Sequence, residues 1–334
     1  MKYILIDTMN TFFRCKHIAA RGTDMWTKMG FALHLTLSSV GKCWREQKAD
    51  HVVFCLEGNS WRKDFYKPYK AQRKVARMAL TESEQEEDEM FFEAYNDLTK
   101  FLDERTNVTM LQAANAEGDD MIAHWICTHP NDEHVIISSD TDFYQLLAEN
   151  VQQFNGVTNE LHTINGIFNE KGKRVKVKKT GEDKPIPDPA WELFLKCVRG
   201  DKSDNIFSAY PGVRVKGTKN KVGIQEAFAD RGNKGYSWNN FMLQRWVDHD
   251  KVEHKVLKDY ERNVTLVDLS AQPEWVKDEM DIAVAQAYVK ERKKQVGGHF
   301  LKFCGKYDLV KLSEQADNIA KYLNAPLPDF ENGS

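Results

Sequence analysis

Hydrophobic residues follow two alternating patterns in the first half of the chain. Continuous apolar runs occupy residues 2–7, 51–57, 108–111, 134–139 and 151–154, as is typical of strands buried on both faces of a parallel sheet. Between these runs, apolar residues recur at helical spacing near residues 30–46, 91–102 and 119–127, which indicates amphipathic helices. The alternation predicts an α/β fold with a central, mostly parallel sheet and helices on both faces.

The pattern becomes helical after about residue 185. Residues 191–198 and 224–229 are predicted helices, and long helical stretches with a break at Gly297 and Gly298 follow residue 237. We therefore predict two parts, an α/β domain over residues 1–185 and a helical region over residues 186–334. The polar tail at residues 331–334 is expected to be disordered.

Composition places the chain among ordinary globular proteins, with 334 residues of which 41% are hydrophobic and 29% charged. No apolar run approaches the roughly 20 residues that span a bilayer, and Asp7 interrupts the first run too early for a signal peptide. We therefore expect a cytoplasmic protein, in whatever cell makes it. The six cysteines are scattered without a C-x-x-C pair, which favours reduced thiols over disulfides or a zinc site.

The net charge of −3 conceals a segregation of charges along the chain. Lysines and arginines gather at residues 62–77, 171–179 and 214–221, whereas acids gather at residues 82–93. Three basic stretches in one chain indicate a surface that binds phosphate groups. Any one of these stretches alone could equally be a solvated loop.

The remaining acids carry the candidate chemistry. Asp7, Glu57 and Asp140 follow predicted strands directly, and ligands of such sheets bind beyond the carboxyl ends of the strands. Clustered carboxylates repel one another unless a cation neutralises them, and hard oxygen ligands without a cysteine–histidine cluster favour Mg²⁺ or Mn²⁺ over zinc. The candidate metal ligands come from five segments: Asp7; Glu57; Glu117, Asp119 and Asp120; Asp140 and Asp142; and Asp201 and Asp204.

Each acidic motif also has a purely structural interpretation. Asp140 could cap a helix that follows its strand. Glu117 could stabilise the N-terminus of a helix through the helix dipole, and Asp201 could close an Asx-type turn. The residues alone leave both interpretations open for each motif.

Taken together, the motifs resemble those of the 5′-nuclease superfamily, which includes flap endonucleases, the 5′-exonuclease domains of bacterial DNA polymerases I and phage 5′ nucleases. The sequences that carry this resemblance are I-L-I-D-T-M-N-T-F-F-R, A-E-G-D-D, S-S-D-T-D-F-Y-Q-L-L and R-G-D-K-S-D-N-I, within residues 3–230. W-R-K-D-F-Y-K-P-Y-K-A-Q-R is similar to the basic segment of the T-even phage ribonucleases H, the group that the chain resembles most. The resemblance implies a PIN-type nuclease fold followed by a helical DNA-binding region with a helix–turn–helix-type motif.

The resemblance also implies roles for individual residues. A first Mg²⁺ would lie among Glu57, Glu117 and Asp119, with Asp7 behind them. A second would be served by Asp120, Asp140, Asp142, Asp201 and Asp204. Lys70 and Arg73 would contact the scissile phosphate, and Tyr69 would stack on a base. The expected catalytic residues are Lys70, Arg73, Asp119 and Asp140. The expected nucleic-acid-binding residues are Arg62, Lys63, Lys67, Tyr69, Lys70, Arg73, Arg214, Lys216, Lys219 and Lys221.

Three features depart from the superfamily's pattern. Glu57 replaces the usual Asp and reaches one methylene further, so the first metal is expected to be displaced or bound more weakly. Gly118 replaces an Ala, with no expected consequence. Residues 210–219 are longer and more basic than usual, which favours phosphate contacts over a bound K⁺. Residues 62–95 would form an arch over the active site or, alternatively, a solvated loop and helix.

The implied reaction is hydrolysis of phosphodiesters near 5′ ends or flap junctions of DNA and RNA–DNA hybrids, as in primer removal, replication or repair. A monomer is expected, with a single-strand-binding protein as a further partner. Two other interpretations stay open: a catalytically silent junction-binding protein of the same fold, and a PIN-type ribonuclease. Metal titration separates the silent protein from the nuclease. Comparing cuts in single-stranded RNA and in a DNA flap separates the ribonuclease.

Overall fold

The computed structural model describes residues 1–14 and 24–328. By packing, these residues form two compact units that are interleaved along the sequence. Unit one comprises residues 1–60, 79–186 and those from 273 onward, and unit two comprises residues 61–78 and 187–272. The division into domains at residue 185 stays a prediction. The tail that was expected to be disordered, residues 331–334, lies outside the described residues.

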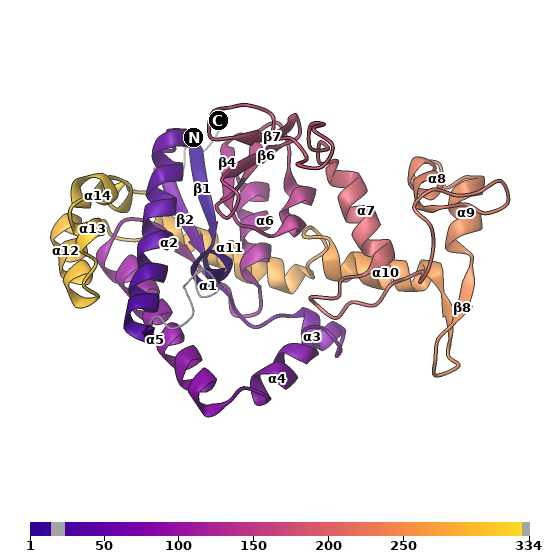
Figure 1. The fold of residues 1–334 in the computed structure, drawn as a ribbon, viewed down its shortest axis with the longest axis horizontal. Helices are drawn as coiled ribbons and strands as arrows, with labels where there is room; N and C mark the ends of the chain where they lie inside the picture. The colour runs from indigo at the N-terminus through magenta and orange to yellow at the C-terminus, as the bar shows by residue number, and fades with distance from the viewer. Residues whose placement is uncertain (15–23, 329–334) are drawn as a thin grey trace. The chain divides into compact units, whose positions relative to one another are not determined.

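A seven-stranded sheet forms the centre of unit one (Figure 1), in the order β3-β2-β1-β4-β5-β6-β7. The first five strands in this order are parallel, and the last two continue the sheet antiparallel. The mostly parallel sheet is therefore confirmed. The strands are β1 (Lys2–Asp7), β2 (His51–Cys55), β3 (Thr109–Leu111), β4 (Glu133–Ile137), β5 (Val151–Asn155), β6 (Glu160–Thr163) and β7 (Gly166–Asn169).

Side chains alternate between the two faces of β1, as the twofold period of a strand requires. Ile4 and Ile6 belong to the main hydrophobic core together with Leu33 and Leu37 of α2 (Met25–Gln47). Tyr3 instead packs its ring against Trp125, 5.3 Å away between centroids. Each face of the sheet thus buries a different layer of helices.

Helices cover both faces of the sheet, as the sequence predicted (Figure 1). One layer holds α2, α5 (Glu82–Arg105), α12 (Val296–Lys306), α13 (Val310–Ser313) and α14 (Ala316–Asn324). The other layer holds α6 (Gly118–Thr128) and α11 (Glu274–Tyr288), which contact each other and strands β1, β2 and β3. Residues 274–324 therefore return to complete unit one. None of the described helices is both long and apolar enough to cross a membrane.

Unit two is a smaller helical body with its own core, formed by residues such as Phe194, Ile224 and Phe241. Its helices are α3 (Arg62–Phe65), α4 (Ala71–Met78), α7 (Pro189–Arg199), α8 (Ile224–Ala229), α9 (Tyr236–Met242) and α10 (Val256–Val267). Every residue of α4 is exposed. The basic half of residues 62–95 is therefore largely helical, and a capping box at Thr81 opens its acidic half as helix α5.

The helical region is confirmed, but one feature of it was not predicted and one expected feature is absent. Residues after 237 are interrupted by an antiparallel hairpin of β8 (Arg245–Val247) and β9 (Glu253–Lys255), whose strands are too short to show a clear period. The expected break at Gly297 and Gly298 is absent, because α12 begins at Val296 and contains both glycines. Glycine is least disruptive in the first turn, where backbone amides have no partner within the helix.

Candidate metal centre

Three carboxylates leave neighbouring parallel strands at the same edge of the sheet. Asp7 ends β1, while Glu57 and Asp140 follow β2 and β4, the two strands that pair with β1. Burial, together with the negative charges of Glu57 and Asp140, raises the pKa of Asp7 to about 7, against the hydrogen bond that Ser138 donates. The structure therefore brings these three acids close enough to repel one another.

A second group of acids lies at the N-terminus of α6. Glu117, Asp119 and Asp120 each offer an oxygen, and these atoms all lie within 4.8 Å of one another. The side chains of Glu117 and Asp120 are buried, with exposures of 5% and 0%. Glu57 joins this group to the strand edge, because its Oε2 accepts a hydrogen bond from the Gly118 amide at 3.2 Å. Converging hard oxygen ligands of this kind fit a divalent cation such as Mg²⁺ or Mn²⁺.

Three polar residues that the sequence analysis did not single out hold this edge in place. The Ser138 hydroxyl donates to Oδ2 of Asp7 at 2.8 Å and accepts from the Asp140 amide at 3.0 Å. The Asn10 side chain accepts from the Ser139 amide at 3.1 Å. Gln153 of β5 donates to the carbonyls of Ser138 and Asp140. Asn10 and Ser138 fall inside the motifs quoted above, whereas nothing in the sequence pointed to Gln153.

The structural interpretations of the acidic motifs also hold. Asp140 caps the 3₁₀ helix η2 (Thr141–Leu146) by accepting from the Asp142 amide at 3.0 Å. Asp120 accepts from the Glu117 amide at 3.1 Å within a capping box at the start of α6. A cap engages one carboxylate oxygen and fixes the direction of the other. Capping and metal binding are therefore compatible at these positions.

The two remaining predicted ligands, Asp201 and Asp204, belong to unit two, and each has a cationic partner there. Asp201 accepts from the Ser203 hydroxyl at 2.6 Å and pairs with Nζ of Lys196 at 2.6 Å. Burial would raise the pKa of Asp201, but the hydrogen bonds from Lys196 and Ser203 hold it below its usual range. Asp204 pairs with Arg73 at 2.9 Å and with Lys70 at 3.6 Å.

Two residues of the predicted nucleic-acid-binding set are buried inside unit two. Tyr69 is 3% exposed and packs in a small core with Cys197 and Leu266, so its ring is not presented to a base. Arg62 is 1% exposed, and its Nε donates to the carbonyl oxygen of Leu266 at 2.8 Å. Both were expected at the surface because sequence position alone does not separate a buried cation or tyrosine from an exposed one. Their predicted roles are therefore corrected to structural ones.

Apart from Lys70, whose side chain is only 14% exposed, the other predicted nucleic-acid-binding residues are accessible. Lys63, Lys67 and Arg73 are exposed, as are Arg214, Lys216, Lys219 and Lys221. Arg214 and Lys221 line a hollow of about 680 Å³ between the basic stretch at residues 214–221 and α9, together with Asn240 and Gln244. Exposed cations and amide side chains around one concave surface suit phosphate oxygens.

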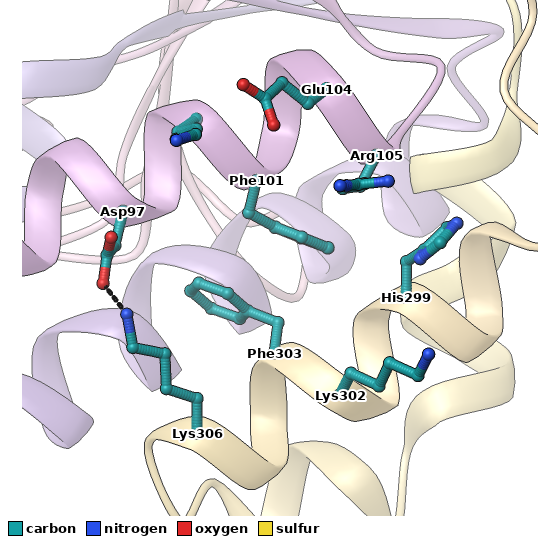
Figure 2. A pocket seen from close by; sticks show the side chains of 9 residues that line it. Asp97, Phe101, Glu104, Arg105, His299, Lys302, Phe303 and Lys306 are labelled. Carbon is teal, nitrogen blue, oxygen red and sulfur yellow. Dashed lines mark hydrogen bonds and ion pairs between the residues drawn. The ribbon is translucent and has the colours of Figure 1, made fainter.

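A second hollow, of about 500 Å³, lies between α5 and α12 in unit one. Figure 2 shows Phe101 and Phe303 facing each other between the two helices, with ring centroids 4.5 Å apart and planes 19° from parallel. Lys100, Arg105 and Lys302 line its rim together with Asp97 and Glu104. No residue of the predicted site lines this hollow.

Comparisons with known proteins agree with this arrangement. Residues 2–177, more than half of the chain, match the family model described as 5′-3′ exonuclease, N-terminal resolvase-like domain. The flap endonuclease of Escherichia phage T5 is 26% identical over 230 residues, which cover 68% of this chain and 70% of that protein. The flap endonuclease Xni of Shewanella piezotolerans is 25% identical over 236 residues, 70% of this chain and 79% of that protein.

Solved structures show the same fold. A phage T5 protein co-crystallised with metal ions is similar with a TM-score of 0.57 at 20% identity, over 96% of this chain and 100% of that one. A phage T5 flap endonuclease variant in a complex with DNA and metal ions has a TM-score of 0.56 at 19% identity, over the same shares. With the family model matched over most of unit one's sheet, the chain belongs to the 5′-3′ exonuclease family and carries its N-terminal resolvase-like domain.

Proposed function

We propose that this chain is a metal-dependent 5′ nuclease that hydrolyses phosphodiesters near 5′ ends and flap junctions of DNA and RNA–DNA hybrids. The proposal rests on one observation: the acids that follow strands β1, β2 and β4 lie at the same sheet edge as the acids at the N-terminus of α6. Such a concentration of carboxylates suits divalent cations. Relatives named flap endonuclease, with similar length and fold, support the same substrate class.

Two Mg²⁺ ions, replaceable by Mn²⁺, are the proposed cofactors. Bound ions of this kind lower the pKa of an attacking water and offset charge on the phosphate. Glu57, Glu117 and Asp119 would hold the first ion, and Asp120, Asp140 and Asp142 would hold the second. Asp7 would lie behind the ligands of the first ion, and Ser138 ties it to Asp140.

The cations of unit two supply the proposed contacts with nucleic acid. Lys70 and Arg73 would bind the scissile phosphate, and Arg214 and Lys221 would bind a duplex backbone at the hollow that they line. Phosphate contacts of this type fix the register of the substrate without reading its sequence. We infer specificity for the shape of a junction.

The proposed setting is replication or repair in the cytoplasm, including removal of RNA primers. The protein would act as a monomer, alongside a single-strand-binding protein. Support for this setting comes from the relatives, which include 5′-3′ exonucleases and DNA polymerases I.

A flap-cleavage assay tests the proposal. Purified wild-type protein with Mg²⁺ is expected to release a labelled 5′ flap, and Asp119→Asn and Asp140→Asn are expected to abolish cutting while retaining junction binding. Asp317→Asn, which changes an exposed acid on α14 of the same unit, is the matched control and should cut like wild type. A folded wild-type protein that leaves the flap intact in Mg²⁺ and in Mn²⁺ contradicts the proposal.

A further inference from the structure

One carboxylate of unit two engages three side chains of the basic segment. Asp204 accepts a hydrogen bond on Oδ1 from Nη2 of Arg73 at 2.9 Å and one on Oδ2 from the Tyr69 hydroxyl at 3.1 Å. Nζ of Lys70 lies 3.6 Å from Oδ2. The Asp204 side chain is 16% exposed, so these partners enclose most of it. Both carboxylate oxygens are thus directed at the basic segment.

The backbone around Asp204 holds the same two segments together. The Lys70 amide donates to the carbonyl oxygen of Asp204 at 2.8 Å. Next to it, the Asn205 side chain donates to the Pro68 carbonyl at 2.7 Å, and the Gln72 side chain donates to the Ser203 carbonyl at 2.8 Å. These bonds join residues more than 130 positions apart in the sequence. The two segments are therefore held together by several hydrogen bonds within unit two.

Lys70 itself adopts a left-handed backbone conformation, with a φ of 53°. A lysine rarely adopts this conformation unless its surroundings impose it. The Lys70 backbone amide donates a hydrogen bond to the Asp204 carbonyl oxygen, and the Lys70 ammonium group pairs with the Asp204 carboxylate. Asp204 thus contacts both the backbone and the side-chain end of Lys70. Asp204 therefore determines where the lysine's ammonium group lies.

The side chains of Arg73 and Lys70 differ in the fraction that is exposed and can contact a ligand. The Arg73 side chain is 57% exposed, and a guanidinium carries five donors in a fixed fork. It can hold Asp204 with one nitrogen and present the others to a phosphate. The Lys70 side chain is only 14% exposed and lies over the Tyr69 ring, 4.8 Å from its centroid.

We propose that Asp204 is a positioning residue that aligns Lys70 and Arg73 for the scissile phosphate, and that it acts through these cations instead of through a metal ion. The proposal rests on the proposed function, since it concerns the same reaction. A carboxylate enclosed by an arginine, a lysine and a tyrosine hydroxyl is a poor ligand for Mg²⁺, which requires near-ideal octahedral geometry. It is well suited to hold two cations, because it accepts a charge-assisted hydrogen bond from Arg73 and lies 3.6 Å from the Lys70 ammonium group.

Asp204→Asn in the full chain tests the proposal, because the change removes the charge and preserves the size. Mn²⁺ binding measured by calorimetry is expected to show the wild-type number of ions, with affinities within about threefold, since no ligand is lost. On a 5′-flap substrate, kcat is expected to fall at saturating metal, and additional metal is not expected to restore it. Loss of one Mn²⁺, or rescue of the rate by excess metal, overturns the proposal.

A mutant cycle in a background that carries both Lys70→Ala and Arg73→Ala provides a second readout. If Asp204 acts through these two cations, adding Asp204→Asn to this background lowers kcat by no more than about threefold, although Asp204→Asn in the wild-type background lowers it strongly. Effects that multiply contradict a positioning role. Thermal melting of each variant shows whether a loss of rate reflects a loss of fold.

Tyr69→Phe keeps the assay informative if Asp204→Asn does not fold. Removing the hydrogen bond from the Tyr69 hydroxyl to the Asp204 carboxylate is expected to lower kcat by about three- to tenfold and to leave the number of bound Mn²⁺ ions unchanged. An unaltered kcat in this variant contradicts the proposed network. Asp119→Asn identifies the other kind of failure. If wild type and Asp119→Asn bind metal equally and neither cuts, the proposed function is wrong. That result says nothing against the positioning role of Asp204.

Discussion

The Gly118 amide donates a hydrogen bond to Oε2 of Glu57 at 3.2 Å, and a methyl group on Gly118 would lie 3.3 Å from the other carboxylate oxygen, Oε1. Such a contact is tighter than most that a Cβ atom makes. Glu57 and Gly118 are the two positions at which the acidic motifs depart from the superfamily's pattern. We infer that they compensate, because the longer acid occupies space that a Cβ atom on residue 118 would enter.

Gly118→Ala is therefore expected to displace the Glu57 carboxylate and to weaken metal binding by about tenfold, with little change in the melting temperature. Glu57→Asp alone should also weaken binding, because the shorter side chain no longer reaches the Gly118 amide. The double variant should recover part of the loss. Mn²⁺ calorimetry on the three proteins measures this, and effects that simply multiply would show that the two positions are independent.

Metal binding is expected to release a proton from Asp7. In the metal-free protein the pKa of Asp7 is raised to about 7 by burial, opposed by the Ser138 hydrogen bond and increased by the Glu57 charge. A cation favours the ionised form, so its affinity should rise as the pH increases from 6 to 8. Calorimetry at pH 6.5 in two buffers with different ionisation enthalpies counts the released proton. Asp7→Asn should release less.

The same pKa makes the metal-free protein less stable as pH rises. The folded chain holds the Asp7 proton more tightly than the unfolded chain, in which the carboxyl titrates near 3.8. Its stabilising effect is complete below that value and is lost as the pH rises through about 7. Melting in EDTA across this range should show the decline, and saturating Mg²⁺ should reduce it, since a bound cation favours the ionised form of Asp7 at every pH in the range.

Acid should destabilise the fold through His51. Burial lowers the pKa of this ring to about 4, against a hydrogen bond with the Ala325 carbonyl. The unfolded chain binds the proton near 6.5, so stability is present above that pH and falls as the pH drops toward 4, by up to about 3 kcal/mol. Urea unfolding between pH 4 and 7 measures this slope. His51→Gln should flatten it, whereas His249→Gln, at an exposed position, should leave it unchanged.

The stacked pair Phe101 and Phe303 is expected to hold α12 on α5. Phe303 is 7% exposed, and truncating a buried phenylalanine costs about 3–5 kcal/mol. Phe303→Ala should therefore lower the free energy of unfolding strongly. Leu301→Ala, at a half-exposed position of the same helix, should change it by less than about 0.5 kcal/mol. Equal effects of the two changes in urea unfolding would contradict this view of the interface.

The parallel part of the sheet could be predicted because its strands are continuous apolar runs that end in acids. Asp7, Glu57 and Asp140 were placed at one edge on that basis, and the strand order β2-β1-β4 brings them together. The hairpin of β6 and β7 escaped prediction. Its strands are only four residues long each, and residues such as Glu160 and His162 are buried through polar contacts that no hydrophobic period reveals.

Burial of polar residues explains most of the errors at the site. Arg62 and Tyr69 lie in a stretch that is otherwise exposed, and only the core of α7 and α10 shows that they point inward. The pairing of Gly118 with Glu57 also depends on a contact across 61 positions of sequence. The spacing of apolar residues indicates which face of a helix or strand is buried. The burial of Arg62 and Tyr69 and the contact of Gly118 with Glu57 depend instead on which distant segments pack together.

The return of residues 274–324 to unit one has a consequence for synthesis of the protein. The Tyr322 hydroxyl donates to the Leu37 carbonyl across 285 positions, so a ribosome makes helix α2 long before its covering helix exists. At about 5–20 residues per second, the part of α2 that α14 covers stays exposed for roughly 15 to 60 seconds. Nascent chains, and fragments that end before α12, should therefore depend on chaperones to stay in solution, whereas the finished chain should not.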